Sequence, residues 1–324
     1  MNENPELSSG AATSQLQEVR KRMTEVIRGQ ADVIDLMLTV LLARGHGLLE
    51  GVPGTAKTLS VRLLALLMSI RFKRVQFTPD LMPSDILGTT VFTPGTNEFH
   101  LHRGPIFTDL LLADEINRSP AKTQAALLEA MAERHATVDG VRHLLSPVFT
   151  VFATQNPVEF EGTYPLPEAQ QDRFLMKIRV GYPAAQAEGE ILKAIHEGNP
   201  PDQINAEKIA PVLDIDGLIN MQRAADQVRV EPGILEYILR IVRSTREHES
   251  IQLGGGPRAS IAVLTSAKSW ALVQGRDFVT PDDVQRVLNP VLEHRIMLTA
   301  DAEISGTDKA TVLADLVSKQ EIPR

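Results

Sequence analysis

The chain has 324 residues, a formal net charge of −8 and no cysteine. This length allows about two domains with a substantial core. Without cysteine there are no disulfides and no thiolate metal sites, which fits a reducing compartment, and the negative charge gives no overall basic surface for nucleic acid. Because the N-terminus lacks the apolar core of a signal peptide and the apolar stretches are too short to span a bilayer, we expect a cytoplasmic protein without membrane insertion.

The first part of the chain predicts a tail and two helices. Residues 1–14 are polar and lack apolar periodicity, which is typical of a disordered tail. Helical spacing follows over residues 15–26 and 31–43. Ile27 and Gly29 lie in the turn between these helices, just before the first strand. Two interpretations stay open for this turn: contact with a nucleotide base, or a plain connection between helices.

A glycine-rich loop ending in a Lys-Thr pair lies between a short strand at residues 46–50 and a helix that starts near residue 59. In this context the backbone N–H groups and the positive end of the helix hold a polyphosphate, which predicts bound ATP. Lys57 would reach the β- and γ-phosphates, and the Thr58 hydroxyl would bind Mg²⁺. The predicted nucleotide-binding loop consists of Gly51, Val52, Pro53, Gly54, Thr55, Ala56, Lys57 and Thr58.

The loop departs from the usual pattern at Ala56, where glycine commonly precedes the lysine. We expect this departure to be mild. A residue in the first helical turn can take a negative φ, where a methyl group does not clash, and alanine is the best helix former.

Two later strands end in polar side chains. The apolar run at residues 110–113 is followed by Asp114 and Glu115, and a second buried strand ends just before Asn156. Ligands of open α/β sheets bind at the carboxyl ends of the strands. Asp114 is therefore expected to bind Mg²⁺ and Glu115 to polarise the attacking water; the alternative is a solvated acidic pair that caps the next turn. Asn156 would bind the γ-phosphate or the water, or only shape the turn before Pro157.

Hairpins and a helical second half complete the pattern. Residues 89–101 and 137–144 predict hairpins, the second with a type I′ turn at its Asp-Gly pair. Helices dominate after residue 183, so we expect an α/β domain at residues 15–183 and a helical domain at residues 184–324. A glycine-rich turn places Arg258 at the start of a helix, from which it would reach a phosphate across the domain cleft or form a solvated surface pair.

Four motifs in this order make the chain resemble the MoxR family of AAA+ ATPases, over nearly its whole length after the tail. They are the loop at residues 51–58, Ala113-Asp114-Glu115-Ile116-Asn117-Arg118, Ala153-Thr154-Gln155-Asn156-Pro157 and the stretch from Leu166 to Phe174. The alanine before the lysine is usual in that family. The resemblance implies an α/β P-loop NTPase fold: an αβα sandwich with a parallel sheet and a helix-2 insert hairpin, followed by a small all-α lid domain.

The resemblance also implies roles for single residues. They are a Walker A loop at residues 51–58, Walker B acids at Asp114 and Glu115, sensor 1 at Asn156, an arginine finger at Arg173 and sensor 2 at Arg258. A finger supplied by a neighbouring subunit adds roughly 10³–10⁵ in rate, so the active site should be shared within a homo-oligomeric ring, by family a hexamer. Arg118, beside the acids, is the alternative finger.

By the same resemblance, we expect an ATP-hydrolysing ring that remodels or matures client proteins. In some family members the ring inserts a metal or cofactor, together with a partner that carries a von Willebrand factor A (VWA) domain. One alternative is a nucleic-acid translocase or transcription-associated ATPase, although lysine is absent from both predicted hairpins, which makes nucleic acid an unlikely partner. The other is a scaffold gated by nucleotide binding.

Overall fold

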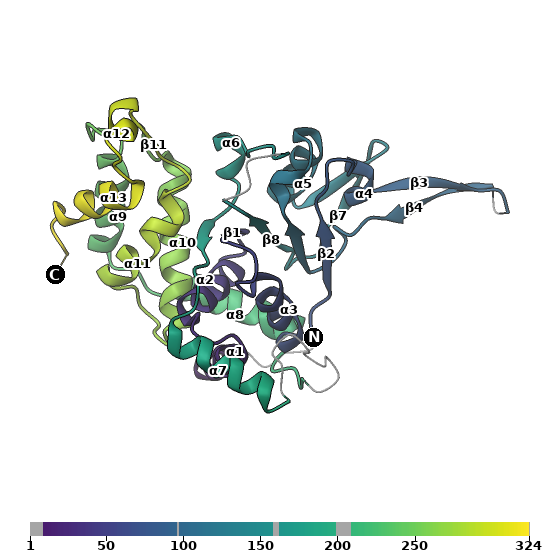
Figure 1. Cartoon of the computed structure of the whole chain (residues 1–324), viewed down its shortest axis with the longest axis horizontal. Coiled ribbons are helices and arrows are strands. Elements are labelled where there is room, and N and C mark those ends of the chain that lie inside the picture. Colours follow the sequence, from purple (N-terminus) through teal and green to yellow (C-terminus); the bar gives the residue numbers. More distant parts are fainter. Residues whose placement is uncertain (1–8, 96, 158–161, 199–208, 324) are drawn as a thin grey trace, which may run out of the picture.

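A computed structural model of the chain describes residues 9–95, 97–157, 162–198 and 209–323. Its centre is a five-stranded sheet with the order β2-β5-β8-β1-β9, in which all neighbouring strands run parallel (Figure 1). The strands are β1 (Gly47–Glu50), β2 (Phe72–Gln76), β5 (Leu110–Asp114), β8 (Thr150–Gln155) and β9 (Met176–Arg179).

Successive side chains of the central strands enter two separate buried clusters, because side chains alternate between the faces of a sheet. Leu110 and Leu112 pack with α1 (Ser9–Val26), α2 (Ala31–Leu42) and α3 (Lys57–Leu67). Leu111 and Ala113 pack on the other face with α5 (Ala121–Glu133). Strand β5 is apolar up to Asp114 because helices cover both faces of the sheet there.

Helix α1 begins at Ser9, so the tail expected at residues 1–14 is wrong for residues 9–14; residues 1–8 lie outside the described part. The helix is anchored further along: Leu16 is buried, and Gln17 Nε2 donates to Val273 O of α10 (Pro257–Val273) at 2.7 Å. The two alanines at positions 11 and 12 favour continuation of an anchored helix.

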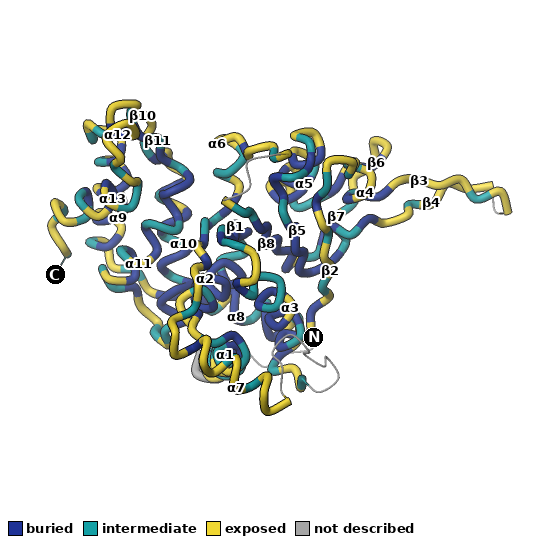
Figure 2. The backbone as a smooth tube through the Cα atoms, in the orientation of Figure 1, coloured by how far each residue is buried: buried dark blue, intermediate teal, exposed yellow. Residues whose placement is uncertain are grey.

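Two hairpins interrupt the alternation of strands and helices. After α4 (Pro83–Leu87), β3 (Gly88–Thr93) and β4 (Glu98–Arg103) form an arm that extends well away from the sheet in Figure 1. Figure 2 shows that much of this arm is exposed. The second hairpin consists of β6 (His135–Val138) and β7 (Val141–Leu144). Its turn residues have φ values of 48° and 79°, as the predicted type I′ turn requires.

The second half is helical, with one small sheet that the sequence analysis did not predict. Strands β10 (Ile251–Leu253) and β11 (Met297–Leu298) pair antiparallel, so this half is not strictly all-α. The two strands are too short to show an alternating pattern. The remaining elements of the chain are η1 (Ile116–Arg118), α6 (Glu168–Gln171), α7 (Ala185–His196), α8 (Ile215–Gln227), α9 (Pro232–Ser244), α11 (Pro281–Leu292), α12 (Ala300–Ile304) and α13 (Lys309–Ser318).

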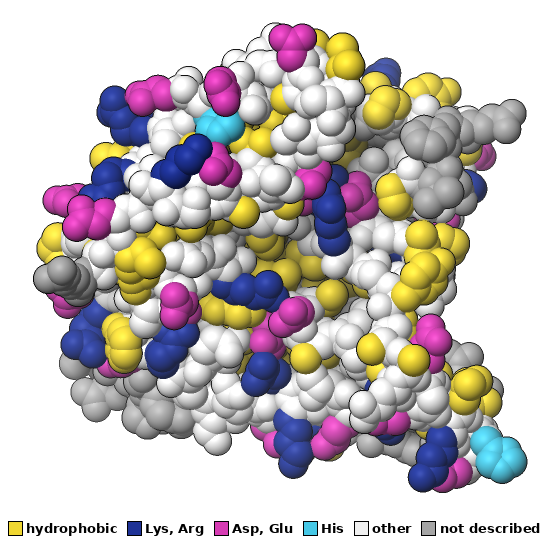
Figure 3. Space-filling model, turned by 60° about the vertical axis from the view of Figure 1, so that its left-hand side comes forward, with side chains coloured by type: hydrophobic (Ala, Val, Ile, Leu, Met, Phe, Trp, Pro, Cys, Tyr) yellow, Lys and Arg dark blue, Asp and Glu magenta, His cyan; other side chains and the backbone are white. Residues whose placement is uncertain are grey.

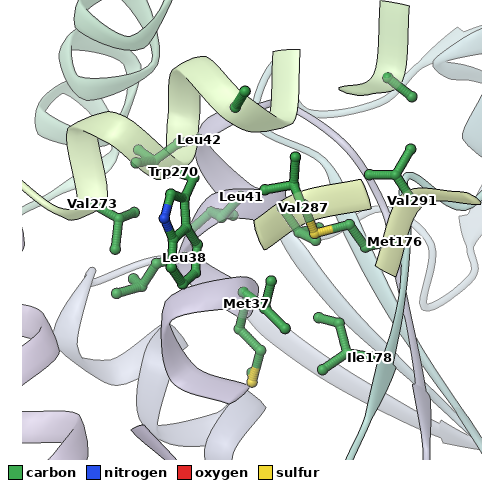
Figure 4. Packing of buried hydrophobic residues seen from close by; sticks show 14 of the residues in the cluster. Met37, Leu38, Leu41, Leu42, Met176, Ile178, Trp270, Val273, Val287 and Val291 are labelled. Carbon is green, nitrogen blue, oxygen red and sulfur yellow. The ribbon is translucent and has the colours of Figure 1, made fainter. Parts of the chain in front are cut away.

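The helical half packs directly on the first half through one continuous buried cluster. Figure 4 shows Leu41 of α2 between Trp270 of α10 and Val287 of α11, with Met176 of β9 beside Val287. Because residues from both halves share this cluster, no break in packing marks residue 183, and the expected domain ranges stay a prediction. Of the helices that the structure describes, none is both long enough and apolar enough to cross a membrane.

A buried histidine joins the start of β1 to its neighbours. His46 Nδ1 accepts a hydrogen bond from the Val151 N–H at 3.0 Å, and its Nε2 lies 3.2 Å from Met131 O, to which it donates. Burial and, to a lesser degree, the charge of Arg134 lower the pKa of His46 to about 3. The ring therefore stays neutral and uses both nitrogens to link β8 and α5.

The pKa of His46 predicts a pH-dependent stability. The unfolded chain takes up a proton below the ordinary pKa of 6.5, whereas the folded chain does so only near 3. The free energy of unfolding should therefore fall as the pH falls from 6.5 towards 3, by up to about 1.4 kcal/mol per pH unit from this one group. Urea unfolding of wild type and His46→Gln between pH 7 and pH 5 measures the slope, which should be shallower in the variant.

An exposed histidine provides the control. His100 lies on the β3–β4 arm, and its side chain is 55% exposed, so His100→Gln should leave the slope unchanged. An identical slope in wild type and His46→Gln would show that His46 is not responsible.

Candidate active site

The carboxyl ends of β1, β5 and β8 surround a cavity of about 540 Å³. The strands end level with one another: Glu50 pairs with Gln155, and the Gly51 N–H donates to Gln155 O at 3.2 Å. The cavity brings together most of the predicted site, namely Ile27, Pro53, Gly54, Thr55, Ala56, Lys57, Thr58, Asp114, Glu115 and Asn156.

The loop after β1 folds around the Lys57 ammonium group. Lys57 Nζ donates to Gly51 O at 2.5 Å and to Val52 O at 2.8 Å. Burial lowers the pKa of Lys57, while the charges of Asp114 and Glu115 act in the opposite direction. Gly51 and Val52 shape the loop without lining the cavity; a Cβ at Gly51 would lie 2.3 Å from Val180 O, so only glycine fits there. The loop thus presents a cation at its centre, as phosphate binding requires.

The expectation of a negative φ at Ala56 is wrong. Ala56 is the N-cap of α3 and has φ 61° and ψ 17°, in the left-handed region. This conformation costs an L-residue with a Cβ about 1–2 kcal/mol, whereas glycine adopts it without that penalty. The Ala56 side chain packs against the buried cluster, which offsets part of this cost. The usual glycine at this position is therefore explained by backbone conformation and not by lack of space.

Asp114 is almost fully buried and hydrogen-bonded on both carboxylate oxygens. Its Oδ1 accepts from Thr154 Oγ1 at 2.5 Å, and its Oδ2 accepts from Arg74 Nη2 at 2.6 Å and Nε at 2.9 Å. The alternative of a solvated acidic pair is therefore wrong for Asp114. A carboxylate has about four lone-pair positions, so three donors leave one for a further ligand. The sequence analysis missed Arg74 and Thr154, because they reach Asp114 from neighbouring strands.

Glu115 is held in a strained backbone conformation beside Asp114. Its φ of 56° lies in the left-handed region, which costs a non-glycine residue about 1–3 kcal/mol. The Thr154 hydroxyl accepts from the Glu115 N–H at 2.8 Å and so fixes both acids. Glu115 Oε2 accepts from Gln76 Nε2 at 2.8 Å and lies 3.1 Å from Arg118 Nε. The Glu115 side chain is 32% exposed, which leaves it open to water.

The oxygen donors at the cavity suit a magnesium ion that is bound together with a nucleotide. Mg²⁺ in such sites takes one or two protein oxygens and completes its shell with phosphates and water. Thr58 and Asp114 would supply these oxygens, and the ion would neutralise phosphate charge. Consistent with this limited protein contribution, no group of three or more His, Cys, Asp or Glu side chains suited to a metal is found among the described residues.

Apolar side chains also line the cavity. Ile27 lies in the turn between α1 and α2 and lines the cavity. This turn is therefore more than a plain connection between helices. Pro183 and two residues of α7, Ile191 and Ile195, also line the cavity. Gly29 shapes the turn, with φ 73° and α7 packed behind it. The sequence analysis expected a helix here but did not assign its isoleucines to the site, although their i, i+4 spacing was a usable signal.

The two predicted arginines lie outside this cavity. Arg173 is exposed and donates from Nη1 to Leu128 O at 3.2 Å. Arg258 is 84% exposed, with Nη1 at 3.8 Å from Asp172 Oδ2. In this structure Arg258 forms the surface pair that was the alternative interpretation, and its role towards a phosphate stays a prediction. Its partner, Asp172, is the residue directly before Arg173.

Comparisons with known proteins place the chain in a family. A model of the "ATPase family associated with various cellular activities (AAA)" matches residues 46–176, and an AAA lid domain model matches residues 243–316. The chain is 43% identical to the chaperone MoxR1 of Mycobacterium tuberculosis over 92% of its own length and 80% of that protein. The chain belongs to the MoxR family of AAA+ ATPases.

Further comparisons agree. Protein MoxR of Paracoccus denitrificans is 30% identical over 88% of this chain and 89% of its own length. YeaC of Bacillus subtilis is 46% identical over 94% of this chain and 93% of its own length. The crystal structure of a candidate ATPase from Cytophaga hutchinsonii matches with a TM-score of 0.88 at 37% identity, over 98% of this chain and 97% of that one. The predicted family and the P-loop AAA+ core with a helical lid are confirmed.

The left-handed backbone at Ala56 gives a stability prediction for this MoxR-family loop. Ala56→Gly should raise the free energy of unfolding by about 0.5–1 kcal/mol. Glycine removes the cost of the left-handed conformation, but the greater flexibility of the unfolded chain offsets part of this stabilisation. Ala65→Gly, in the interior of α3, should instead lower it by at least about 1 kcal/mol. Denaturant unfolding of both variants measures the two signs. A loss in Ala56→Gly as large as in Ala65→Gly would contradict the assigned conformation.

Proposed function

We propose that this protein hydrolyses ATP at sites shared between adjacent subunits of a homo-oligomeric ring, and that it uses the energy to remodel or mature client proteins. One observation carries the proposal: the cavity gathers Lys57, Thr58, Asp114, Glu115 and Asn156, whereas Arg173 and Arg258 are exposed outside it. Arg28 lines the cavity but pairs with Glu190 of α7. The two arginines predicted to act on the phosphates lie outside the cavity of their own subunit, and this arrangement suits completion of the site by a neighbour.

Each residue of the cavity has a defined part in the proposed hydrolysis. Lys57 leaves the loop carbonyls for the β- and γ-phosphates. Glu115 orients a water molecule and accepts its proton as the water oxygen bonds to the γ-phosphorus, while the bond to the bridging oxygen of ADP breaks. Asn156 binds the γ-phosphate or the attacking water. Bound Mg²⁺ supplies charge neutralisation on the phosphates. The products are ADP and phosphate.

The contacts of the two candidate fingers favour Arg173 over Arg118. Arg118 lies 3.1 Å from Glu115 of its own subunit, on the side of the acids. Arg173 belongs to the segment between α6 and β9, outside the cavity, where its guanidinium donates to a backbone carbonyl. Arg173 can leave this neutral partner without abandoning a carboxylate. When the same head-to-tail contact is repeated from subunit to subunit, the subunits can close into a ring. The family implies a hexamer.

Protein clients suit the exposed hairpins better than nucleic acid does. Phe92 and Phe99 pair across the β3–β4 arm, with ring centroids 5.1 Å apart, and Phe99 is 71% exposed. Val141 and Leu144 of the second hairpin are 57% and 77% exposed. Apolar side chains on projecting arms favour contact with unfolded or apolar protein segments. MoxR1 of M. tuberculosis is named a chaperone. Insertion of a metal or cofactor, a VWA-domain partner and a cytoplasmic location come from the family resemblance and belong to this proposal.

The nucleic-acid alternative has weaker support. Basic and acidic side chains are interspersed on the face drawn in Figure 3, with hydrophobic side chains in a hollow near its centre. A translocase for nucleic acid would need a basic track. The scaffold alternative, in which binding matters more than turnover, is separated from the proposal by the variants described next.

Removal of the lysine or the glutamate should separate binding from hydrolysis. Lys57→Ala should abolish detectable ATP binding, because the loop loses its cation, whereas Glu115→Gln should bind ATP, assemble, and lose hydrolysis by about two orders of magnitude or more. Lys73→Ala, which removes an exposed lysine on β2, is the matched control. Binding of a fluorescent ATP analogue and release of phosphate measure the two steps. Retained ATP affinity in Lys57→Ala would overturn the loop assignment, and undiminished client maturation by Glu115→Gln would favour the scaffold.

Mixed assemblies should show that the arginine acts between subunits. Arg173→Ala subunits keep an intact cavity, and Lys57→Ala subunits keep an intact finger. Each variant alone should be nearly inactive, and mixtures should recover part of the ATPase activity where a Lys57→Ala subunit donates its finger. Phosphate release across mixing ratios measures the recovery. No recovery at any ratio would argue against a shared site.

A further inference from the structure

An arginine of the lid holds the segment that carries Arg173. Arg295 follows α11, and its guanidinium points at the connection between α6 and β9. Nε donates to Asp172 Oδ1 at 2.8 Å, and Nη2 donates to the backbone carbonyls of Asp172 at 3.2 Å and Phe174 at 2.7 Å. Nη1 donates to Leu175 O at 3.0 Å and also to Val291 O. The residues on both sides of Arg173 are thus tied to one lid side chain.

The geometry of this contact requires a guanidinium group. Arg295 makes five hydrogen bonds, as many as its N–H donors, and its side chain is only 6% exposed. His294 adds a second lid donor: its Nε2 lies 2.9 Å from Phe174 O. A lysine would keep the charge but has three donors on a single nitrogen, so it cannot hold carbonyls that lie on several sides of a planar fork.

The N–H groups of this connection bond to α6 and to His46 O, and Phe174 is buried in the α/β domain, whereas its carbonyls depend on the lid. Residues 172–175 form turns and bends between α6 and β9, so their carbonyls have no regular ladder to satisfy them. The Arg173 side chain has its bond to Leu128 O in the α/β domain. Asp172 lies between two lid arginines, with Oδ1 bonded to Arg295 and Oδ2 at 3.8 Å from Arg258. The position of the finger backbone is therefore set by the lid as well as by the sheet.

We propose that Arg295 is a positioning residue for the arginine finger: through its five bonds it fixes the backbone on both sides of Arg173 to the lid, so that the finger and the lid take one common position towards the neighbouring subunit. This inference rests on the proposed function, in which Arg173 acts on the ATP of a neighbour. Displacement of a reacting group by about 1 Å can cost about 100-fold in rate. A loosened segment should therefore lower turnover in the neighbour's site without changing nucleotide affinity in its own.

The test uses the assembled full-length protein with the variant Arg295→Lys. Turnover at saturating ATP should fall about tenfold to 100-fold, while the affinity for a fluorescent ATP analogue should stay within about twofold of wild type, because Arg295 lies outside the cavity. Arg286→Lys is the matched control. Arg286 lies on α11, pairs with Asp32 at 3.0 Å and covers the Trp270 ring, so its replacement should leave both quantities within about twofold.

Subunit mixing distinguishes positioning of the finger from a general structural defect. Lys57→Ala subunits have intact fingers, so they should restore hydrolysis to Arg295→Lys subunits. Arg173→Ala subunits should not restore it, because both variants then lack a working finger. Thermal unfolding identifies a variant that fails to fold; in that case Asp172→Ala, which removes one bond of the set, should show the same mixing pattern with a smaller loss of turnover.

Failure of this proposal and failure of the proposed function give different results. If Lys57→Ala restores Arg173→Ala but not Arg295→Lys or Asp172→Ala, the shared site stands and the positioning role is overturned. If Lys57→Ala restores none of them, the shared site is wrong, and the role of Arg295 falls with it. Unchanged turnover in a folded Arg295→Lys protein would also overturn the positioning role.

Discussion

The common end of the parallel strands is the constraint on which the rest of the structure depends. Helices cover both faces of the sheet, so polar side chains of the strands can gather only at the edge where β1, β5 and β8 end together. That edge places the phosphate loop, Asp114 and Asn156 around one cavity. Buried polar contacts hold the strands in register, with Thr154 at the carboxyl ends and His46 at the start of β1. The chemistry of the site is thus a consequence of strand order.

The backbone is strained at two positions beside the cavity. Ala56 and Glu115 both have φ near 60°, although neither is glycine. Each stands where the chain leaves a strand end and turns sharply, at the phosphate loop and after β5. Hydrogen bonds oppose the strain: the Lys57 ammonium closes the loop, and the Thr154 hydroxyl fixes the Glu115 N–H. Such strain persists only where a well-packed scaffold enforces it, and it clusters at functional sites.

The sequence predicted those features that depend on neighbours along the chain. The phosphate loop, the acids after β5 and the Asp-Gly hairpin turn have local signals, and their predicted locations agree with the structure. Contacts between strands were not predictable: Arg74 and Thr154 reach Asp114 across the sheet, and no local pattern records that pairing. The φ of Ala56 was predicted wrongly because loop closure overrides the preference of a single residue.

The packing of the two halves on each other also could not be predicted from the sequence. The glycine-rich turn before Arg258 left two interpretations open, and the packing of α10 and α11 on α2 and β9 places Arg258 beside Asp172. The same packing brings Arg295 to the segment of Arg173. Such placement depends on long-range contacts between helices, which periodicity and capping signals do not encode. Arg258 and Arg295 therefore lie beside the segment that carries Arg173, whereas α7 lines the cavity.

The central claim is that one subunit completes the active site of the next. The most direct measurement is the structure of the assembled Glu115→Gln protein with ATP bound. The account predicts that Arg173 has left Leu128 O and lies within hydrogen-bonding distance of the γ-phosphate in the adjacent subunit, with Arg295 still bonded to the segment that carries it. An arginine from the same subunit at the γ-phosphate, with Arg173 still on Leu128, would contradict the claim.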